Sequence, residues 1–497
     1  MNVVFVQSEH ESLAIGIFSS LLKAQGHTVS LVYDTRLFDC MEMQNKLLNR
    51  LFDVKKQLID EIVSLKPDLI AFSVLTDEYQ WALGMAKRIK QRVNTPIIFG
   101  GLHPTICPEE VIEQDCVDIV CVGEGERAML ELTENIELLT STKRCIKNLW
   151  FKDKRNESAQ LINNLDNLPF PDKRLFYNKQ PNITGNYGIL TSRGCPFNCT
   201  YCASEVLNRI AGNGYLRRRS PQNVIDELVY VKANVGYKIK VIAFWDDTFT
   251  YDIEWLKEFL VLYKEKINIP FHCTGYPIGI TYEKTKLLKD AGCFRLGMGV
   301  QSASEIIRKN ILHRPGLNKQ IAEAAKACKD AGLTIWFDHI LNIPLETEED
   351  QYEALKFYNE VRPSIINVFW LVYYPKTKII QTAINIGMLN PDMVDLINQG
   401  KSTTAMVGRV GGEYSFGKQN FKGYAFMLHL LPLLPQKVMG WMIYHRMFLN
   451  SNPPFIVNIL IKMLVRIKLN QAWESTWFMY ITFKRMWDNT LLKWRTR

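Results

Sequence analysis

Short apolar runs alternate with amphipathic stretches along most of the chain, as in proteins whose strands are connected by helices. The first predicted strands are Val3 to Val6, Thr28 to Tyr33, Leu69 to Ser73, Pro96 to Phe99 and Ile119 to Cys121. The helices predicted between and after them are Leu13 to Ala24, Lys46 to Leu65, Gln80 to Arg92 and Glu126 to Glu134. Five strands joined by helices predict a doubly wound open α/β sheet, which binds ligands at the carboxyl ends of its strands.

A second series of the same kind follows. Its predicted strands are Tyr187 to Thr191, Val241 to Trp245, Pro270 to Thr274, Phe294 to Met298, Thr334 to Ile340 and Ile366 to Leu371. Amphipathic stretches such as Val224 to Asn234 and Asn318 to Ala331 separate them. Six β/α units predict a partial (β/α)6 barrel of the TIM type, which carries its chemistry on loops at the carboxyl ends of the strands.

The chain is long enough for two or three domains, each with its own core. A stretch rich in Pro, Asn and Asp, from Asn156 to Gly185, has the composition of a linker. We therefore expect an open-sheet domain at residues 1–140, a linker at 141–185, a barrel at 186–385 and a mostly helical region at 386–497.

Three cysteines, Cys195, Cys199 and Cys202, fall within eight residues directly after the first barrel strand. A structural zinc ion or an electron-transfer cluster normally takes four protein ligands, so three indicate a distant fourth ligand or an open coordination position. No second Cys-x2-Cys pair exists, and the remaining cysteines are single: Cys40, Cys107, Cys116, Cys121, Cys145, Cys273, Cys293 and Cys328. The triad is interpreted as the ligand set of a 4Fe-4S cluster with one open iron. Incidental cysteines or a zinc knuckle are the alternative.

Polar clusters also follow later barrel strands. They are Phe244-Trp245-Asp246-Asp247-Thr248-Phe249, Gly297-Met298-Gly299-Val300-Gln301-Ser302 and Asn342-Ile343-Pro344-Leu345-Glu346-Thr347. Asp246 and Asp247 are either ligand contacts or a pair of helix N-caps. The run Arg217-Arg218-Arg219 either pairs with a carboxylate or phosphate or forms a solvated loop.

At these residues the chain resembles the radical S-adenosylmethionine (SAM) superfamily, whose signature is this cysteine spacing with an aromatic residue before the last cysteine. The resemblance implies that SAM binds the open iron and that an electron from the reduced cluster splits SAM into methionine and a 5'-deoxyadenosyl radical. It assigns SAM contacts to Tyr201, Asp246, Asp247, Gln301, Ser302 and Glu346. The chain departs from the family where many relatives have Glu at the position of Gln301. No catalytic residue is assigned.

Glycine-rich and polar loops follow the strands of the first series: Ser8 to Ser12, Ser73 to Thr76, Gly100 to Thr105 and Gly123 to Glu126. Paired glycines let a backbone approach a large planar ligand closely. This block resembles the cobalamin-binding, flavodoxin-like domain that precedes the barrel in class B radical SAM proteins. The resemblance implies corrin contacts at Ser8, His10, Ser73, Thr76, Gly100, Gly101, His103, Thr105, Gly123 and Gly125.

The Asp-x-His-x-x-Gly motif that supplies a cobalt ligand in classical cobalamin domains is absent. The nearest register has Ser8, His10 and Leu13. The resemblance therefore implies a corrin without a protein histidine below the cobalt. A degenerate domain that binds nothing is the alternative. His103 is either a corrin neighbour or a histidine that orders its loop.

Charge is concentrated at the carboxyl end. Residues 421–497 contain eleven Lys or Arg residues and two acidic residues, and so carry the whole formal net charge of +9. Basic residues there are interleaved with aliphatic residues and five tryptophans: Trp441, Trp473, Trp477, Trp487 and Trp494. This pattern predicts peripheral contact of 421–497 with a membrane surface. A helical cap packed on the barrel, with snorkelling Lys and Arg, is the alternative, and nucleic-acid binding is a weaker one. No run reaches the roughly 20 apolar residues that span a bilayer.

The first residues lead directly into a strand without the profile of a signal peptide, and an oxygen-labile cluster with unpaired thiols favours the cytoplasm. A cytoplasmic protein, in one version peripheral on the inner face of the membrane, is expected. Its partners would be an external low-potential electron donor, such as a flavodoxin or ferredoxin, and a small-molecule or lipid-like substrate.

Two function classes remain open. The resemblance favours a cobalamin-dependent enzyme that methylates an unactivated carbon, with ring closure, rearrangement or methylthiotransferase-type chemistry as alternatives within the superfamily. The other class is a non-catalytic iron-sulfur electron carrier or a nucleic-acid-binding module. Polar clusters at the expected strand ends favour the enzyme, because a carrier needs no SAM pocket.

Overall fold

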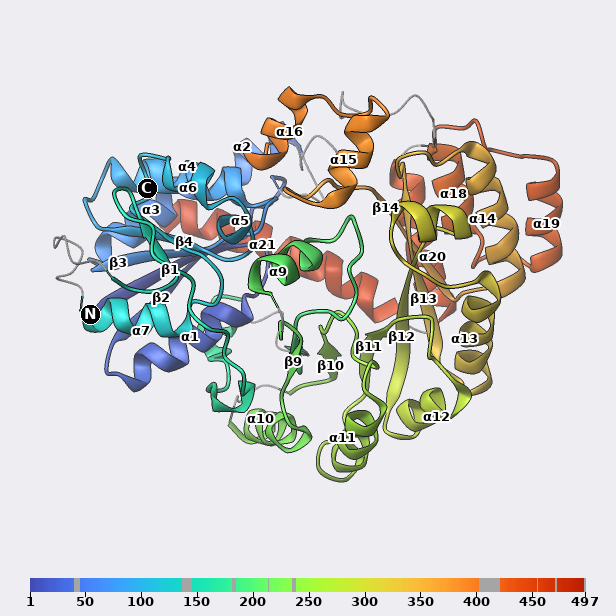
Figure 1. Cartoon of the computed structure of the whole chain (residues 1–497), viewed down its shortest axis with the longest axis horizontal. Coiled ribbons are helices and arrows are strands. Elements are labelled where there is room, and N and C mark those ends of the chain that lie inside the picture. Colours follow the sequence, from blue (N-terminus) through green and yellow to red (C-terminus); the bar gives the residue numbers. More distant parts are fainter. Residues whose placement is uncertain are drawn as a thin grey trace.

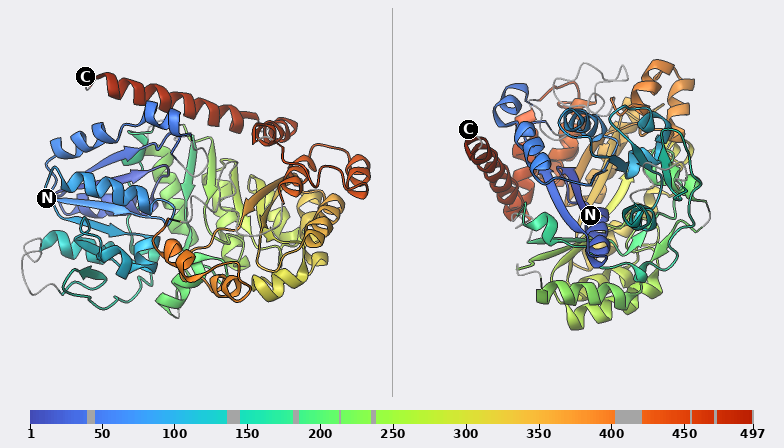
Figure 2. Two further views of the ribbon diagram at one scale, coloured as in Figure 1. Left: turned by 90° about the horizontal axis from the view of Figure 1, so that it is seen from above. Right: turned by 90° about the vertical axis from the view of Figure 1, so that its left-hand side faces the viewer.

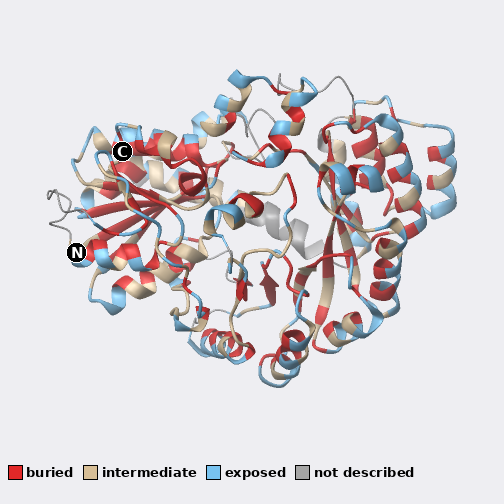
Figure 3. Ribbon diagram, viewed as in Figure 1, coloured by how far each residue is buried: buried red, intermediate tan, exposed pale blue. Residues whose placement is uncertain are grey.

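The computed structural model describes residues 1–39, 45–135, 145–180, 185–212, 214–234, 238–401, 421–453, 455–469 and 472–495. Two six-stranded sheets lie side by side with helices packed against them, and the C-terminal helices run along one side of both (Figures 1 and 2). Figure 3 shows that burial concentrates in the strands and on the helix faces turned toward them. None of the described helices is both long and apolar enough to cross a membrane.

The first sheet has the order β2-β1-β3-β4-β5-β6. Its parallel strands are β1 (Asn2–Ser8), β2 (Thr28–Asp34), β3 (Leu69–Ser73), β4 (Ile97–Gly100) and β5 (Ile119–Cys121). These confirm the predicted doubly wound sheet. A sixth strand, β6 (Leu149–Phe151), pairs antiparallel with β5. It comes from residues 141–185, so part of the expected linker belongs to the first sheet.

The helices of this domain are α1 (Leu13–Ala24), α2 (Lys46–Phe52), α3 (Lys55–Ser64), α4 (Tyr79–Lys90), α5 (Leu102–Ile106), α6 (Pro108–Ile112) and α7 (Glu126–Glu134). The single helix predicted from Lys46 to Leu65 is wrong. Asp53 has extended backbone angles, and its carboxylate accepts a hydrogen bond from the Lys55 amide at 3.0 Å. An Asp that bonds a backbone amide two residues on favours a turn over a continuous helix.

The second sheet is entirely parallel, with the order β14-β13-β12-β11-β10-β7. Its strands are β7 (Asn186–Ile189), β10 (Val241–Phe244), β11 (Phe271–Gly275), β12 (Cys293–Gln301), β13 (Thr334–Leu341) and β14 (Ile365–Trp370). The helices of its β/α units are α10 (Pro221–Asn234), α11 (Ile253–Lys266), α12 (Tyr282–Asp290), α13 (Asn318–Asp330) and α14 (Glu348–Val361). This confirms the partial (β/α)6 barrel.

Two tryptophans lie directly on strand glycines of this sheet. A Cβ atom added to Gly188 would overlap the ring of Trp245, and one added to Gly297 would overlap the ring of Trp336. Each glycine therefore leaves the space that a neighbouring indole fills.

Smaller elements complete the barrel. They are the 3-10 turn η2 (Leu165–Asn167), α8 (Arg174–Tyr177), the antiparallel pair β8 (Ser192–Arg193) and β9 (Arg217–Arg218), α9 (Ala203–Ala211), the π-helical turn η4 (Ile307–Ile311), α15 (Lys378–Asn385) and α16 (Pro391–Asn398). The pair β8–β9 places the segment just before the cysteines beside the three arginines.

The described residues after 420 contain the helices α18 (Lys422–Leu430), α19 (Gln436–Tyr444), α20 (Phe455–Lys468) and α21 (Ala472–Arg495). Met427 and Leu428 of α18 and Met439 of α19 are fully buried in the main core. These two helices are therefore a packed cap on the barrel.

Helix α21 returns to the first domain, where Asn489 donates to the Phe52 carbonyl at 2.9 Å and Lys493 donates to the Leu51 carbonyl at 2.7 Å. Figure 2 shows this helix running along the molecule as a strap.

Candidate active site between the two sheets

A cavity of about 810 Å³ lies between the carboxyl ends of the first sheet and the start of the cysteine loop. Six of the ten residues predicted to contact a corrin line it: Ser73, Gly100, Gly101, Thr105, Gly123 and Gly125. The Thr105 hydroxyl donates to the Gly101 carbonyl at 2.7 Å and accepts from the Gly123 amide at 3.0 Å. Thr105 therefore fixes two of the glycine loops relative to each other.

The other four predicted corrin residues do not line this cavity. Ser8 is buried and bonds Glu78 at 3.2 Å, and Thr76 is fully buried. The His10 side chain is 60% exposed and lies beside Glu9. His103 packs against Tyr79, with 4.1 Å between the ring centroids and an angle of 34° between the rings.

Burial lowers the pKa of His103 to about 3, so its imidazole stays neutral. His103 does not line the cavity, and both interpretations of this histidine stay predictions.

Residues that sequence reasoning did not select complete the cavity. Leu13 and Phe18 of α1, Glu124 and Glu126 contribute from the first domain, and Leu190 contributes from the barrel. Leu13 and Phe18 are apolar residues within a helical pattern, which is equally typical of ordinary core, so the pattern does not indicate a role in ligand binding. Glu124 and Glu126 belong to the Gly123 to Glu126 loop, in which only the glycines were predicted to contact a corrin.

The cysteine loop begins with Gly194, whose φ of +89° suits glycine. A Cβ atom there would lie 2.7 Å from the Tyr215 carbonyl oxygen. Beyond it, the Thr200 amide donates to the Leu312 carbonyl at 3.1 Å and its hydroxyl to the Ile311 carbonyl at 2.6 Å. These contacts anchor the loop against the segment that follows β12.

The cysteines themselves are partly or fully buried: Cys199 is buried, and Cys195 and Cys202 are half-buried. Burial raises the pKa of Cys195 to about 12 and also raises that of Cys202. Thiolates at this site therefore require a nearby positive charge. Cys40 lies outside the described residues. Within the described part of the chain, no three His, Cys, Asp or Glu side chains stand close enough to hold a single metal ion.

An aromatic stack and an arginine contact the cysteine loop. Phe197 stacks on Tyr276 at 4.0 Å, and the Arg314 guanidinium lies 4.3 Å from the centre of the Tyr276 ring. Arg314 donates to the Gly299 carbonyl at 2.7 Å and approaches the Cys199 sulfur at 3.5 Å. This cation was not predicted, because nothing local in the sequence relates residue 314 to residue 199.

Both aspartates after β10 accept hydrogen bonds from residues that flank the three cysteines. Asp246 is buried and accepts hydrogen bonds from the Thr191 amide at 3.1 Å and from the Thr191 hydroxyl at 2.8 Å. Asp247 lines the cavity and accepts from the Ser204 hydroxyl at 2.9 Å. The N-cap of α11 is instead Asp252, so the alternative of a helix-capping pair is wrong.

The remaining predicted SAM residues lie at the carboxyl ends of β12 and β13 or beside the cluster cysteines. Gln301 has a φ of +69°, and Ser302 is buried with its carbonyl accepting from Arg308 at 2.6 Å. Glu346 is buried and accepts from the Ile343 amide at 3.2 Å, and burial raises the pKa of its carboxyl to about 8. Tyr201 is half-buried next to Cys202.

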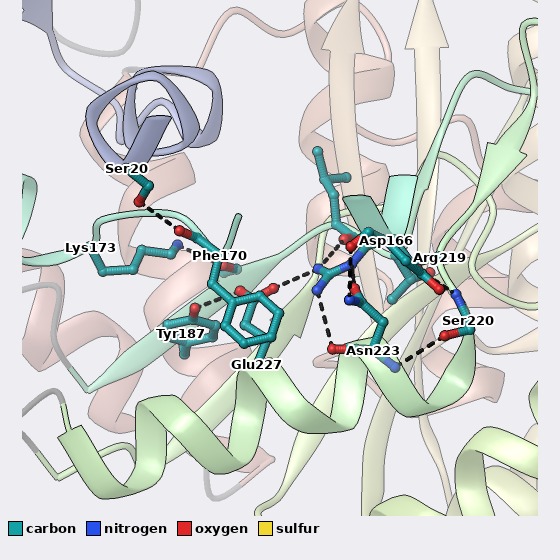
Figure 4. Close-up of polar contacts among 12 residues, drawn as sticks. Ser20, Asp166, Phe170, Lys173, Tyr187, Arg219, Ser220, Asn223 and Glu227 are labelled. Carbon is teal, nitrogen blue, oxygen red and sulfur yellow. Dashed lines mark hydrogen bonds and ion pairs between the residues drawn. The ribbon is translucent and has the colours of Figure 1, made fainter. Parts of the chain in front are cut away.

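The three consecutive arginines are not a solvated loop. Arg217 forms a two-pronged pair with Glu124 at 2.9 and 3.0 Å. Arg219 pairs with the buried Glu227 at 2.5 Å, and Glu227 also accepts from the Tyr187 hydroxyl at 2.6 Å. Figure 4 shows Arg219, Glu227 and Tyr187 beside the linker residues Asp166 and Phe170.

The linker is fixed in the same place. The Phe170 carbonyl accepts from Ser20 of α1 at 2.7 Å, and Asp166 accepts from the Ser220 amide at 2.9 Å (Figure 4). Lys173 donates to the Gly188 carbonyl at 2.7 Å and pairs with Glu11 at 2.8 Å. The linker thus joins the first domain to the barrel through directed contacts.

Comparison with known proteins identifies the two halves. Residues 2–133 match the B12 binding domain family, and residues 189–358 match the radical SAM superfamily. An uncharacterized methyltransferase of Pyrococcus horikoshii is 30% identical over 341 residues, covering 66% of this chain and 72% of that protein. The chain belongs to the cobalamin-dependent radical SAM enzymes.

Other relatives agree with this family. The anaerobic magnesium-protoporphyrin IX monomethyl ester cyclase of Rubrivivax gelatinosus is 25% identical over 386 residues, which cover 73% of this chain and 64% of that protein. The solved radical SAM methyltransferase TsrM from Kitasatospora setae, with cobalamin and a [4Fe-4S] cluster bound, superposes with a TM-score of 0.65 at 14% identity. That match covers 98% of this chain and 99% of TsrM, and it shows a shared fold.

Membership in this radical SAM family gives the chain a 4Fe-4S cluster, SAM and cobalamin as cofactors. The site residues fit these groups. Three thiols on one anchored loop, with the Arg314 cation beside Cys199, form a donor set for a cluster. The glycine-lined cavity suits a large planar ligand, since Gly100, Gly101 and Gly123 expose backbone where side chains would intrude. Enzymes of this family also need an external reductant and a small-molecule substrate.

Proposed function

We propose that this enzyme transfers a methyl group from SAM to an unactivated carbon of its substrate. The supporting observation is that one cavity is lined both by the glycine loops of the first domain and by Arg193, Gly194 and Asp247 beside the cysteine loop. The corrin region and the start of the cysteine loop therefore border one cavity. The bound cofactors would supply a methyl carrier and the reductive cleavage of SAM.

The protein side chains have supporting roles in this proposal. Cys195, Cys199 and Cys202 hold the cluster, and Arg314 compensates their negative charge. Tyr201, Asp246, Asp247, Gln301, Ser302 and Glu346 are proposed to surround SAM. The apolar wall formed by Leu13, Phe18 and Ile189 keeps water away from a reactive radical.

Ring closure is the second candidate, because the Rubrivivax gelatinosus relative is described as a cyclase. The two chemistries leave different products from SAM. Methyl transfer leaves S-adenosylhomocysteine in addition to 5'-deoxyadenosine, whereas a cyclase that uses only the radical leaves 5'-deoxyadenosine alone.

The test uses the full-length protein, reconstituted anaerobically with iron, sulfide and hydroxocobalamin, then reduced and given SAM with a deuterated methyl group. We expect S-adenosylhomocysteine to form only when hydroxocobalamin is present. Formation of 5'-deoxyadenosine without S-adenosylhomocysteine in the cobalamin-loaded protein would favour the cyclase.

We also propose an external flavodoxin- or ferredoxin-like donor, and peripheral contact of α20 and α21 with an anionic membrane. Phe483, Trp487 and Trp494 form one exposed stripe along α21, with side chains 68%, 62% and 75% exposed. Leu460, Leu464 and Ile467 form a similar stripe on α20. The side chains of Trp473 and Trp477 lie outside the described residues.

Charge supports an anionic surface as the partner, because the positive excess of the chain falls in residues 421–497. Each Lys or Arg near an anionic bilayer contributes about 1 kcal/mol, and salt weakens that contribution. Apolar side chains at the interface add a contribution that salt does not remove. A membrane-held enzyme would suit a lipid-like substrate.

Vesicle cosedimentation tests the membrane contact. Truncation after residue 420 is unsuitable because it would also remove α18 and α19, which are part of the barrel's core. We instead expect the double variant Phe483→Ser, Trp487→Ser to lose most binding to vesicles containing phosphatidylserine. The matched control, Ile306→Ser with Tyr282→Ser, changes two exposed apolar residues of the barrel and should bind like the wild type. Equal binding of both double variants would contradict the proposal.

A further inference from the structure

A cluster of four charged side chains joins the first domain to the segment that carries the cysteines. Arg193 of β8 pairs with Glu124 at 2.8 Å and with Glu126 at 2.5 Å. Arg217 of β9 makes its two-pronged pair with the same Glu124. We call Glu124, Glu126, Arg193 and Arg217 the interdomain charge cluster.

The interdomain charge cluster is largely shielded from water. The side chains of Arg217 and Glu126 are 7% and 6% exposed, and that of Glu124 is 16% exposed. Burial alone would raise the pKa of Glu124, but the hydrogen bond from Arg217 and the charge of Arg193 lower it overall. Buried, two-pronged Arg–carboxylate pairs fix geometry more strictly than surface pairs do. The cluster therefore holds both partners in one relative position.

On the barrel side, the cluster acts on the cysteine loop through a short path. Arg193 precedes Cys195 by only two residues. Arg217 also donates to the Tyr215 carbonyl at 3.2 Å. The same carbonyl oxygen lies so close to Gly194 that a Cβ atom there would be 2.7 Å from it. A shift of Glu124 would therefore move Arg217 and Arg193 together, and with them the contact between the Tyr215 carbonyl and Gly194 that fixes the start of the cysteine loop.

On the other side, the cluster is part of the cavity wall. Gly123, Glu124, Gly125 and Glu126 all line the cavity in which a corrin would lie. The Glu124 backbone is held by Asn148, another residue of the cavity wall, whose side-chain amide donates to the Glu124 carbonyl at 2.7 Å. A ligand that packs against Gly123 and Gly125 would therefore contact the same segment whose carboxylates, Glu124 and Glu126, form ion pairs with Arg193 at the start of the cysteine loop.

We propose that Glu124 and Glu126 are positioning residues that couple occupancy of the corrin cavity to the order of the Cys195–Cys202 loop. When cobalamin fills the cavity, the segment 123–126 loses freedom, and the interdomain charge cluster transmits this restraint to the loop. The coupling requires cobalamin binding but not methyl transfer. It therefore stands or falls independently of the proposed reaction.

Hydrogen–deuterium exchange of the iron-reconstituted, full-length protein tests the coupling, with and without hydroxocobalamin. Absorbance of the retained corrin confirms occupancy in each sample. The reporting amides are those of residues 197–202, since the nearer residues 192–194 line the cavity and would be shielded directly. In the wild type we expect hydroxocobalamin to slow exchange several-fold both at 123–126 and at 197–202.

The variant Glu124→Gln should keep the protection at 123–126 and lose it at 197–202. Glu126→Gln leaves the Glu124–Arg217 pair intact and should lose part of the protection at 197–202. This variant replaces Glu124→Gln in the test if Glu124→Gln does not fold. The matched control is Glu61→Gln, which removes the exposed pair between the first domain and Lys179 of the linker at 2.6 Å, and should behave like the wild type.

Two results would overturn the proposal. The first is that hydroxocobalamin does not slow exchange at 197–202 in the wild type, or slows it as much in both Glu124→Gln and Glu126→Gln as in the wild type. The other is failure of both folded variants to retain hydroxocobalamin, because that would make the carboxylates corrin ligands instead of positioning groups.

Discussion

Replacing Glu346 with Gln should stabilise the protein at alkaline pH and have little effect at acidic pH. Glu346 is buried at the turn after β13, and burial raises the pKa of its carboxyl from 4.5 to about 8. Between these two values the folded protein retains a proton that the unfolded chain releases. Stability contributed by this group is therefore complete below about pH 4.5 and is lost as the pH rises toward 8.

The size of the effect follows from the shift in pKa. Each unit corresponds to about 1.4 kcal/mol, so ionisation of Glu346 costs on the order of 3–5 kcal/mol by pH 8. A glutamine carries no charge and avoids this cost. The free-energy advantage of Glu346→Gln over the wild type should therefore grow by about 1.4 kcal/mol per pH unit between the two pKa values.

Scanning calorimetry of the SAM-free protein between pH 5 and 8.5 measures the difference. The matched control is Glu348→Gln, two residues away and exposed at the start of α14, whose melting temperature should follow the same pH dependence as the wild type. Parallel curves of melting temperature against pH for Glu346→Gln and the wild type would refute the argument that this carboxyl is buried and protonated.

Three further changes test other parts of the structure. Cys199→Ala should lose the bound iron and sulfide after reconstitution, whereas the exposed Cys145→Ala should keep them; full iron content in both would contradict the ligand assignment. Gly297→Ala should cost roughly 1–3 kcal/mol in unfolding free energy, because its methyl group would overlap the Trp336 ring, and an unchanged denaturation midpoint would contradict that packing. His103→Phe should leave the absorption spectrum of bound cobalamin unaltered, since this side chain does not line the cavity; a spectrum showing a changed axial ligand would count against the described geometry.

The sequence was sufficient to predict what is local and periodic. Both parallel sheets followed from strand-like runs separated by amphipathic helices, and the cysteine spacing indicated the cluster. The strand β6 was missed because three residues among Asn and Asp give little periodic signal. The split between α2 and α3 depends on a single side-chain hydrogen bond at Asp53, which a hydrophobic pattern does not register.

Long-range contacts were beyond a single sequence. Arg217 finds its carboxylate partner at Glu124, ninety-three positions earlier, and Arg314 reaches Cys199 from a different β/α unit. His103 has the residue type of a ligand, yet the fold turns it onto Tyr79 and away from the cavity. Residue type and strand-end position thus predicted a region of the site, while the direction of each side chain was set by packing between domains.

The most direct test of the account is the reductive cleavage of SAM by the reconstituted protein. Wild-type protein loaded anaerobically with iron and sulfide, reduced with dithionite and given SAM should produce 5'-deoxyadenosine, and Cys202→Ala treated identically should produce none. A wild-type protein that holds a complete 4Fe-4S cluster and still yields no 5'-deoxyadenosine would contradict the assignment of this chain as a radical SAM enzyme.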